Sequence, residues 1–250
     1  MAPTPQKTEC KSPEKDLAIW LQDNPLGSLS KADQRLVARS AKFCQFSRGE
    51  TIYNEGENRK FVYLLVSGIA IQKRGEVLGS SISINIVRPK QILGLLSFES
   101  DCPYLLTTKA LSEVSTIRIP VQTMRSVWES SPDLVRQVSR MLMEHLTDAY
   151  QTISHSSYSR ADKRILSTLI NISEQASLES NIRCISFPVT RREIAELSHT
   201  TVETAIRVLK IWEKNGWVVT KKKKITLTCL ECLQSSVNMH SHQIESVTRS

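Results

Sequence analysis

Short apolar runs separated by glycine dominate the chain between Phe43 and Pro120. The segment from Ser81 to Ile86 alternates polar and apolar residues with period two, the pattern of a half-buried β-strand. Six of the eight glycines fall between residues 49 and 94, where they mark turns between the runs. Many short strands joined by turns predict a sandwich, barrel or jelly roll.

The hydrophobic period changes after Pro132. Six apolar positions then recur 3, 4, 4, 3 and 4 residues apart, which predicts an amphipathic helix with a stripe roughly 27 Å long. One way to cover such a stripe is the same helix of a second chain. The alternative is that the helix packs on the strand-rich domain of its own chain. The six positions are Val135, Val138, Leu142, Leu146, Ala149 and Ile153.

Two short helices with the same start signal are predicted beyond residue 159. The segments 190–193 and 200–203 both read Thr-x-x-Glu. This is a capping box, in which the threonine caps unpaired amides and the glutamate reaches back to the cap. Two short capped helices separated by about three residues predict a helix-turn-helix.

The second of these helices has one charged face and one apolar face. Arg207 can bind guanine with two hydrogen bonds, and Glu203 can accept one from the amino group of cytosine. Ile206 can contact a thymine methyl, and lysine suits phosphate. The alternative is an ordinary solvated amphipathic helix. The charged face consists of Glu203, Arg207, Lys210 and Lys214, and the apolar face of Ala205, Val208, Leu209 and Trp212.

A hairpin is predicted directly after this helix. Residues 217–220 and 225–228 are short β-prone runs on either side of four consecutive lysines, Lys221 to Lys224. A lysine-rich tip is often only a solvated loop. Beside a recognition helix it suits the phosphate backbone and makes binding depend on salt.

Composition and charge favour a nucleic-acid partner and give no sign of an enzyme. The 33 Lys and Arg exceed the 25 Asp and Glu by eight, and residues 183–224 alone hold ten basic and four acidic side chains. The chain lacks a phosphate-binding Gly-x-x-x-x-Gly-Lys loop, a Gly-x-Ser-x-Gly elbow and a His-Glu-x-x-His helix. Without an apolar leader or a long apolar run, we expect a cytoplasmic protein with no membrane partner.

The six cysteines are scattered along the chain. In the absence of an export signal we predict thiols rather than a disulfide framework. Cys44 and Cys102 are candidate thiol switches. Cys229 and Cys232 have the spacing of a metal or redox pair, but no second pair lies nearby, and the alternative is that they cap the hairpin as a short helix. No metal site is predicted.

Four segments give the chain a resemblance to a known family. Residues 48–56 (Arg-Gly-Glu-Thr-Ile-Tyr-Asn-Glu-Gly) and 63–68 (Tyr-Leu-Leu-Val-Ser-Gly) resemble the β-roll signature of the cyclic-AMP receptor protein/fumarate-nitrate regulator (Crp/Fnr) superfamily of bacterial transcription regulators. Residues 190–195 and 201–207 resemble its helix-turn-helix signature. The resemblance covers about residues 17–233.

The resemblance implies an α+β chain of five parts. These are a flexible N-terminal arm (1–16), a jelly-roll or β-roll sensor domain of the cyclic-nucleotide-binding-like type (17–127), a long dimerisation helix (128–158), a C-terminal winged helix-turn-helix DNA-binding domain (159–233) and a flexible tail (234–250).

The implied function is that of a homodimeric, sequence-specific regulator bound to double-stranded DNA, with RNA polymerase as a further partner if it is an activator. Glu203 and Arg207 match base-reading positions of the family and imply a TTGA-like half-site in a palindrome. The alternative is a ligand-binding β-roll module whose basic domain contacts a protein or membrane. The residues predicted to contact DNA are Arg191, Thr201, Val202, Glu203, Ile206, Arg207, Lys210, Lys221 and Lys222.

The predicted signal is one other than cyclic AMP. Cyclic-nucleotide sensors of this family use a Gly-Glu-Leu segment and an Arg-Ser or Arg-Thr pair, whereas this chain has residues 91–98 and Cys102-Pro103 at the corresponding places. Burying an anionic phosphate without an arginine is costly. An iron–sulfur cluster needs four ligands, and the N-terminal segment offers only Cys10. Neither group is therefore predicted.

Other signals stay open. Leu95 and Tyr104 belong to an apolar region that suits a small uncharged or aromatic effector or a filled core. His145 on the long helix is a candidate haem ligand, with a packed helix residue as the alternative. Control by a thiol switch and constitutive activity are the remaining possibilities.

Overall fold

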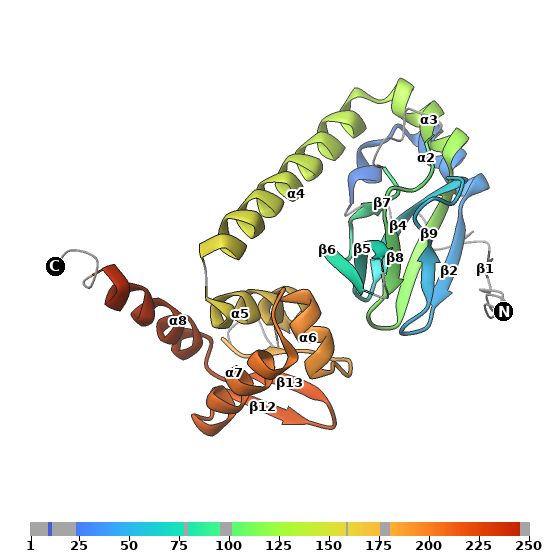
Figure 1. Cartoon of the computed structure of the whole chain (residues 1–250). Coiled ribbons are helices and arrows are strands. Elements are labelled where there is room, and N and C mark those ends of the chain that lie inside the picture. The colour runs from blue at the N-terminus through green and yellow to red at the C-terminus, as the bar shows by residue number, and fades with distance from the viewer. Residues whose placement is uncertain are drawn as a thin grey trace. The chain divides into compact units, whose positions relative to one another are not determined.

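The structure is a computed structural model that describes residues 10–11, 24–77, 80–95, 102–158, 160–175 and 181–245. The chain divides into two compact units, residues 1–149 and residues 150–250 (Figure 1). The first unit is rich in strands and the second in helices. This arrangement confirms the α+β class predicted from the sequence.

Two antiparallel sheets form the first unit. The five-stranded sheet has the order β1-β2-β9-β4-β7 and the four-stranded sheet the order β3-β8-β5-β6. Short strands in two facing sheets are the predicted β-roll. The strands are β1 (Cys10–Lys11), β2 (Lys42–Phe46), β3 (Thr51–Tyr53), β4 (Phe61–Ser67), β5 (Ala70–Val77), β6 (Ser80–Val87), β7 (Ile92–Leu93), β8 (Thr107–Ala110) and β9 (Val114–Pro120).

Strand β4 is buried on both faces, which explains its nearly continuous apolar sequence. Tyr63 and Leu65 lie in the core between the two sheets. Val62 and Leu64 lie in a second core, which the five-stranded sheet shares with helices. These helices are η1 (Pro25–Ser28), α2 (Lys31–Ser40), α3 (Val121–Ser130) and the start of α4 (Pro132–Tyr158).

The alternating segment predicted as a strand lies in β6, but two of its isoleucines point outward. Ile82 and Ile84 are 62% and 49% exposed, whereas Ser83 between them is 5% exposed. The β5–β6 pairing contains a register shift between Gln72 and Lys73. Period-two alternation determines which residues share a face, whereas pairing register determines which face is buried.

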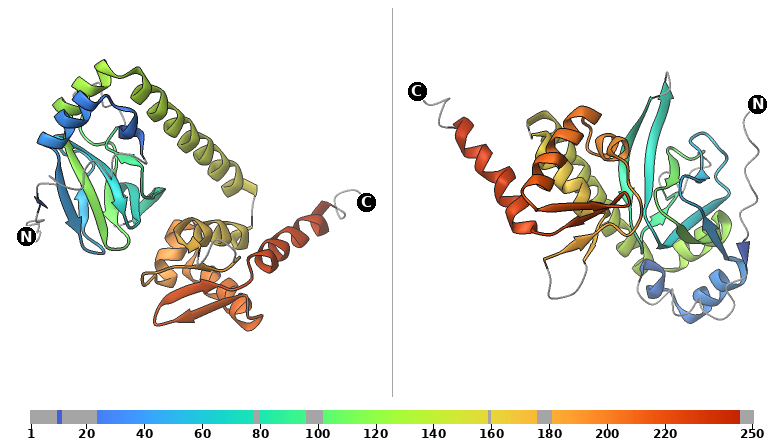
Figure 2. Two further views of the ribbon diagram at one scale, coloured as in Figure 1. Left: turned by 180° about the vertical axis from the view of Figure 1, so that it is seen from behind. Right: turned by 90° about the horizontal axis from the view of Figure 1, so that it is seen from below.

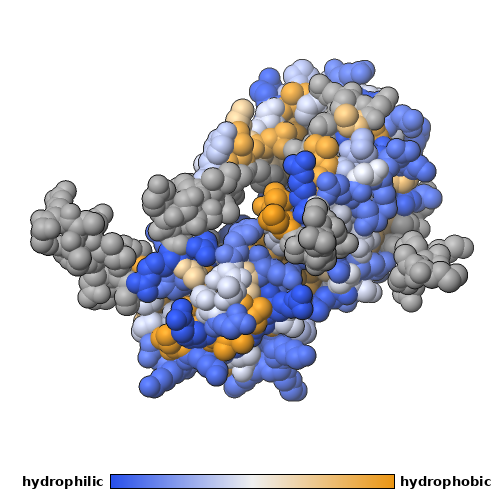
Figure 3. Space-filling model, viewed as in Figure 1, coloured by the Kyte–Doolittle hydropathy of each residue, from blue (hydrophilic) through white to orange (hydrophobic). Residues whose placement is uncertain are grey.

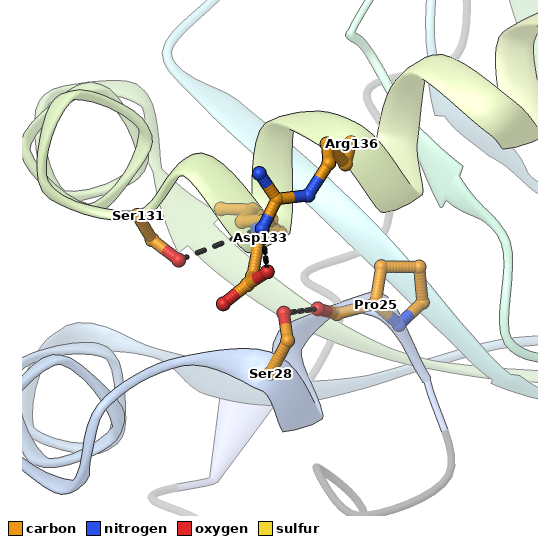
Figure 4. Close-up of polar contacts among 6 residues, drawn as sticks. Pro25, Ser28, Ser131, Asp133 and Arg136 are labelled. Atoms are coloured by element: carbon orange, nitrogen blue, oxygen red, sulfur yellow. Dashed lines mark hydrogen bonds and ion pairs between the residues drawn. The ribbon is translucent and has the colours of Figure 1, made fainter.

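Helix α4 begins where the predicted change of period occurs. Pro132 takes the first helical position, where an N–H would have no partner within the helix, so its absence costs no hydrogen bond. The Ser131 hydroxyl accepts a hydrogen bond from the Leu134 N–H at 3.3 Å. In the same first turn, Asp133 forms an ion pair with Arg136 (Figure 4).

Two apolar faces run along α4, where the sequence predicted a single stripe. The two faces lie about 145° apart, at 100° per residue. A helix with two apolar faces can pack on its own domain and still offer a second face to a partner. The buried face consists of Leu134, Val138 and Met141, and the exposed face, here called the α4 stripe, consists of Met143 (65% exposed), Leu146 (45%) and Tyr150 (63%).

The predicted stripe residues are therefore divided. Val138 is buried on the first unit, Leu142 packs partly against the same core, and Leu146 is exposed. Val135 is half-buried. The side chains of Ala149, Ile153 and His145 lie outside the described part of the chain. Residues 128–130, predicted as the start of the long helix, belong to α3.

The second unit is the predicted winged helix-turn-helix. Helices α6 and α7 form the helix-turn-helix, and Figure 2 shows the β12–β13 hairpin extending beyond the helices of this unit. Its sheet has the order β10-β11-β13-β12. The elements are α5 (Ala161–Ile172), β10 (Glu174–Gln175), β11 (Arg183–Cys184), α6 (Arg191–Leu197), α7 (Val202–Lys214), β12 (Val218–Lys221), β13 (Lys224–Leu227) and α8 (Leu230–Glu245).

Helix α8 continues through most of the predicted flexible tail. Leu233 and Val237 are 0% and 5% exposed, and α8 packs against α5. These two residues lie four positions apart, so they share one helical face that the core covers. Residues 246–250 and most of the predicted N-terminal arm lie outside the described residues, but Cys10 and Lys11 pair with β2.

Candidate nucleic-acid interface

Helix α6 begins at the capping box predicted from the sequence. The Thr190 hydroxyl accepts a hydrogen bond from the Glu193 N–H at 3.1 Å, and the Glu193 carboxylate accepts one from the Thr190 N–H at 2.7 Å. The reciprocal bonds satisfy two amides that the first helical turn leaves open.

Helix α7 begins one residue later than predicted, so its predicted capping box is wrong. The cap is Thr201, whose hydroxyl accepts a hydrogen bond from the Thr204 N–H at 3.2 Å. Thr200 instead closes the preceding turn, where its N–H donates to the Ala195 carbonyl at 2.9 Å. Glu203 is thus not used to cap the helix, and its carboxylate stays on the exposed face.

The turn between α6 and α7 is fixed by α5. Arg164 donates hydrogen bonds to the carbonyl oxygens of Ser198 at 3.0 Å and His199 at 3.1 Å. The Thr168 hydroxyl donates to the Leu197 carbonyl at 3.3 Å and accepts from the Ser198 hydroxyl at 3.0 Å. The sequence reading missed both α5 residues because they precede their partners by 29 to 35 residues.

His199 occupies the tightest position of this turn. Its φ of 49° is in the left-handed region, which is unfavourable for residues other than glycine, asparagine and aspartate. Burial lowers the pKa of its imidazole, and the neighbouring Arg164 guanidinium lowers it further. The turn therefore favours neutral His199.

We expect the second unit to lose stability as pH falls below about 6.5, the ordinary histidine pKa. Because the pKa of His199 is lowered in the folded state, the unfolded state binds a proton first, and this protonation stabilises it relative to the folded state as pH decreases. The variant His199→Asn tolerates the same backbone and does not titrate. Denaturant unfolding at a series of pH values should show a smaller acid dependence for this variant, and identical pH profiles would contradict the assignment.

The polar face of α7 points to solvent. Glu203, Arg207 and Lys210 are exposed, and Ile206 beside them is 36% exposed. On the opposite face, Ala205 and Leu209 are fully buried. Among the described residues, neither Glu203 nor Arg207 has a hydrogen-bond or ion-pair partner. Two side chains with complementary base-reading chemistry are thus available on one rigid helix.

Arg191, predicted to contact DNA, joins three elements of the domain. Its guanidinium forms a 2.6 Å ion pair with Glu213 of α7 and a 3.1 Å hydrogen bond with Thr220 of β12. The Thr220 hydroxyl donates to the same Glu213 carboxylate at 2.6 Å. The network holds the wing beside α7 and is partly shielded from solvent, since the Arg191 and Glu213 side chains are 27% and 31% exposed.

The wing ends in a two-residue turn between the paired residues Lys221 and Lys224. Lys222 and Lys223 have φ of 49° and 64°. Positive φ at both central residues is the requirement of a type I′ turn, for which Asn-Gly is the preferred sequence. Two lysines therefore hold a strained turn at the tip, and all four lysines of the hairpin are exposed.

Replacing the turn by Lys222→Asn/Lys223→Gly should have two opposite effects. Relief of the left-handed strain is expected to stabilise the second unit by about 1–2 kcal/mol. Loss of two charges is expected to weaken binding to all DNA and to reduce the slope of log affinity against log salt by about 2. Thermal unfolding and salt titrations measure the two effects.

The matched control is Lys221→Gln/Lys224→Gln, which removes two charges from strand positions outside the left-handed turn. It should reduce the salt slope equally without raising stability. Equal stabilisation in both variants would contradict the strained-turn explanation, and an unchanged salt slope would contradict contact with phosphate.

The interior of the β-roll is filled by stacked tyrosines. The rings of Tyr53 and Tyr104 stack with centroids 4.0 Å apart, and those of Tyr53 and Tyr63 lie 5.7 Å apart. The Tyr104 hydroxyl donates to the Phe61 carbonyl at 2.6 Å. Burial raises the pKa of all three tyrosines, so they stay neutral. Arg118 lies nearby, with its guanidinium 4.2 Å from the centre of the Phe61 ring.

The two predicted effector residues lie in different cores. Tyr104 belongs to the core between the sheets, and Leu95 to the core shared with the helices. Leu96, Ser97 and Phe98 of the compared segment lie outside the described residues. The structure therefore supports the filled-core alternative for Tyr104.

The prediction that all cysteines are thiols is wrong. Cys229 and Cys232 form a disulfide, and Cys44, which is fully buried opposite Cys10 in the β1–β2 pairing, is also disulfide-bonded. Cys102 keeps a thiol and is exposed. Disulfide formation depends on the separation and direction of cysteines in the folded chain, which composition alone does not reveal.

The described residues contain neither a membrane span nor a metal cluster. No helix among them is long and apolar enough to cross a membrane. No group of three or more His, Cys, Asp or Glu side chains in that part of the chain has the arrangement of a metal site.

A β-roll followed by a long helix and a winged helix-turn-helix defines a DNA-binding transcription regulator with a sensor domain. Comparison with known families agrees with this class. Residues 43–131 match the model of a cyclic nucleotide-binding domain, and residues 163–236 match that of a Crp-like helix-turn-helix domain. The chain belongs to the Crp/Fnr superfamily.

Individual relatives are distant. The chain is 26% identical over 185 residues to the transcriptional activator protein FnrA of Stutzerimonas stutzeri, which covers 72% of this chain and 74% of that protein. It is 23% identical over 189 residues to the CRP-like cAMP-activated global transcriptional regulator of Mycobacterium tuberculosis H37Rv, covering 75% and 84%. FixK2 from Bradyrhizobium japonicum has a similar fold, with a TM-score of 0.67 and 20% identity over 78% of this chain and 96% of that chain.

Proposed function

We propose that this Crp/Fnr regulator is a homodimer that reads a TTGA-like palindrome and responds to a signal other than cyclic AMP. The observation that carries sequence-specific reading is the exposed face of α7. Glu203 and Arg207 lie one turn apart near the helix start, where recognition helices contact base edges. An exposed arginine and carboxylate on one rigid helix face match guanine and cytosine in a G·C pair.

The surrounding residues suit contacts with the DNA backbone. Thr201 and Val202 are at the N-terminus of α7, where free amides and the helix dipole favour a phosphate. Lys210 lies one turn after Ile206, and Lys221 and Lys222 are at the wing. Arg191 acts in this proposal by holding the wing in place through Glu213 rather than by reading a base.

The α4 stripe supports the homodimer. Met143, Leu146 and Tyr150 are exposed on one helix, and Figure 3 shows hydrophobic surface along α4. A helix pair related by two-fold symmetry buries such a stripe twice. Two recognition helices then meet two half-sites of a palindrome. A contact with RNA polymerase belongs to this proposal if the regulator is an activator.

The tyrosine stack and the residues at the phosphate-binding positions support a signal other than cyclic AMP. Cys102 and Pro103 stand where the family's cyclic-nucleotide sensors have an arginine and a hydroxyl residue. Arg118 is an arginine of the same interior, but its guanidinium lies over the Phe61 ring.

A salt series on a TTGA-N6-TCAA duplex tests the function. Steep salt dependence and strong preference over a scrambled duplex support the regulator, whereas equal weak binding to both duplexes favours a basic surface for another partner. The same titration repeated with saturating cyclic AMP tests the signal. An affinity that rises with the nucleotide would overturn that part of the proposal.

A further inference from the structure

The disulfide between Cys229 and Cys232 lies at the junction of the wing and α8. The two residues have the sequence Cys-Leu-Glu-Cys, and their Cα atoms are 5.3 Å apart. Cys229 is only partly buried, so a reductant in solution can approach the bridge. A C-x-x-C pair that closes a loop of two intervening residues is the arrangement used for thiol–disulfide exchange.

The start of α8 presents a backbone N–H and the positive end of the helix dipole to one of the two sulfurs. Cys229 directly precedes the first residue of the helix, and its sulfur accepts a hydrogen bond from the Cys232 N–H at 3.3 Å. The helix has 16 residues, so the aligned peptide dipoles place positive charge at this end. A cysteine at such a position has a thiolate that forms readily.

The residue before Cys229 is bonded to the segment that follows the recognition helix. The Thr228 hydroxyl donates to the Gly216 carbonyl at 2.6 Å, and the Thr228 N–H donates to the Trp217 carbonyl at 2.9 Å. Gly216 and Trp217 connect α7 to β12. The bridge therefore adjoins the segment that joins the recognition helix to the wing.

The residue after Cys232 anchors α8 in the core. Leu233 is fully buried, and its N–H donates to the Cys229 carbonyl at 3.2 Å. The disulfide thus spans the short distance between the wing attachment at Thr228 and the core anchor at Leu233. A covalent link at this place restrains the first turn of α8 and the end of β13 together.

We infer that Cys229 and Cys232 form a reversible thiol–disulfide exchange site that adjusts DNA binding, an inference that rests on the proposed function. The reductant is a dithiol. One of its thiolates attacks the Cys232 sulfur, the bond between the two cysteines breaks, and Cys229 leaves as the thiolate held by the helix start. The second thiol of the reductant then attacks the reductant sulfur that is bonded to Cys232 in the mixed disulfide. Cys232 departs and takes up a proton, and the dithiol is oxidised by two electrons.

The oxidised form is the form that binds DNA more tightly. Reduction leaves the first turn of α8 held by hydrogen bonds alone, so the wing attachment at Thr228 loses a restraint. The closed loop is short, and a short loop gives a modest restraint. Reduction should therefore lower affinity for the TTGA duplex by about threefold to tenfold.

The first part of the test establishes the exchange. The full chain carrying Cys102→Ser/Cys184→Ser is equilibrated in buffers of reduced and oxidised dithiothreitol, alkylated and digested. The peptide with Cys229 and Cys232 should change reversibly between a bridged and a doubly alkylated form, with Cys229 alkylated first by a brief pulse at neutral pH. Absence of the bridge in the oxidised protein, or failure to re-form it after reduction, overturns the inference.

The second part measures DNA affinity in the same buffers. The redox dependence of DNA affinity should disappear in Cys229→Ser/Cys232→Ser. These substitutions leave Cys44 and its bridge in place. Redox dependence that persists in this variant assigns the effect to another pair and overturns the inference, as does equal affinity of both redox states. Lack of preference for TTGA in both states overturns the proposed function instead, and the alkylation pattern still decides whether the pair exchanges.

Discussion

Charge reversal by Arg207→Glu is expected to abolish discrimination between the TTGA duplex and a scrambled duplex. Arg207 is exposed and lies one helical turn after Glu203 on the polar face of α7. A bidentate contact with guanine contributes about 1–3 kcal/mol to discrimination, and a carboxylate in its place adds repulsion from the phosphates. The ratio of affinities for the TTGA and scrambled duplexes should decrease by about tenfold to a hundredfold or more. Competition binding at fixed salt measures this ratio.

The matched control is Arg35→Glu, which makes the same change of net charge at an exposed position of α2 in the first unit. It should preserve the preference for TTGA. Full discrimination by Arg207→Glu would show that α7 does not read bases through this side chain. Equal losses in both variants would point to net charge alone.

Leu146→Asp is expected to convert the proposed dimer to a monomer. The residue lies in the middle of the α4 stripe and is 45% exposed in the single chain. Burial of a leucine contributes about 1.5–3 kcal/mol to the free energy of dimer formation. Two-fold symmetry places the substitution in both subunits, so its effect is doubled. The dimer dissociation constant should rise by about two to four orders of magnitude, as measured by analytical ultracentrifugation, and affinity for the palindrome should fall with it.

Leu36→Asp in α2 is the control, because Leu36 is 43% exposed and thus nearly equal to Leu146 in accessibility. This variant should remain dimeric. Circular dichroism of both variants checks that the helices persist. A dimeric Leu146→Asp protein with intact DNA binding would remove the α4 stripe from the interface.

The local signals in the sequence predicted the DNA-reading unit well. The Thr190–Glu193 capping box forms with both of its hydrogen bonds, since its partners are three residues apart. The position of Glu203 and Arg207 opposite Ala205 and Leu209 follows from the helical period alone. The start of α7 was misplaced by one residue because Thr200 and Thr201 can both cap a helix.

Features that depend on distant contacts could not be predicted in this way. Arg164 secures the helix-turn-helix from another helix, and Arg191 is tied to Glu213 and Thr220. Each partner is at least 22 residues away. Sequence periodicity carries no information on such separations.

By itself, the sequence determined the kind of each element and the chemistry of its faces. Periods of two and 3.6 residues, caps and lysine runs are local properties, and they indicated a sandwich, barrel or jelly roll, a long helix and a helix-turn-helix followed by a basic hairpin. The β-roll itself was implied by the resemblance of residues 48–56 and 63–68 to a family signature. Only the tertiary structure decided which apolar face of α4 is buried, which cysteines meet, and what fills the sensor. These outcomes depend on strand register and packing between segments far apart in the chain, and many sequences with the same local pattern leave them open.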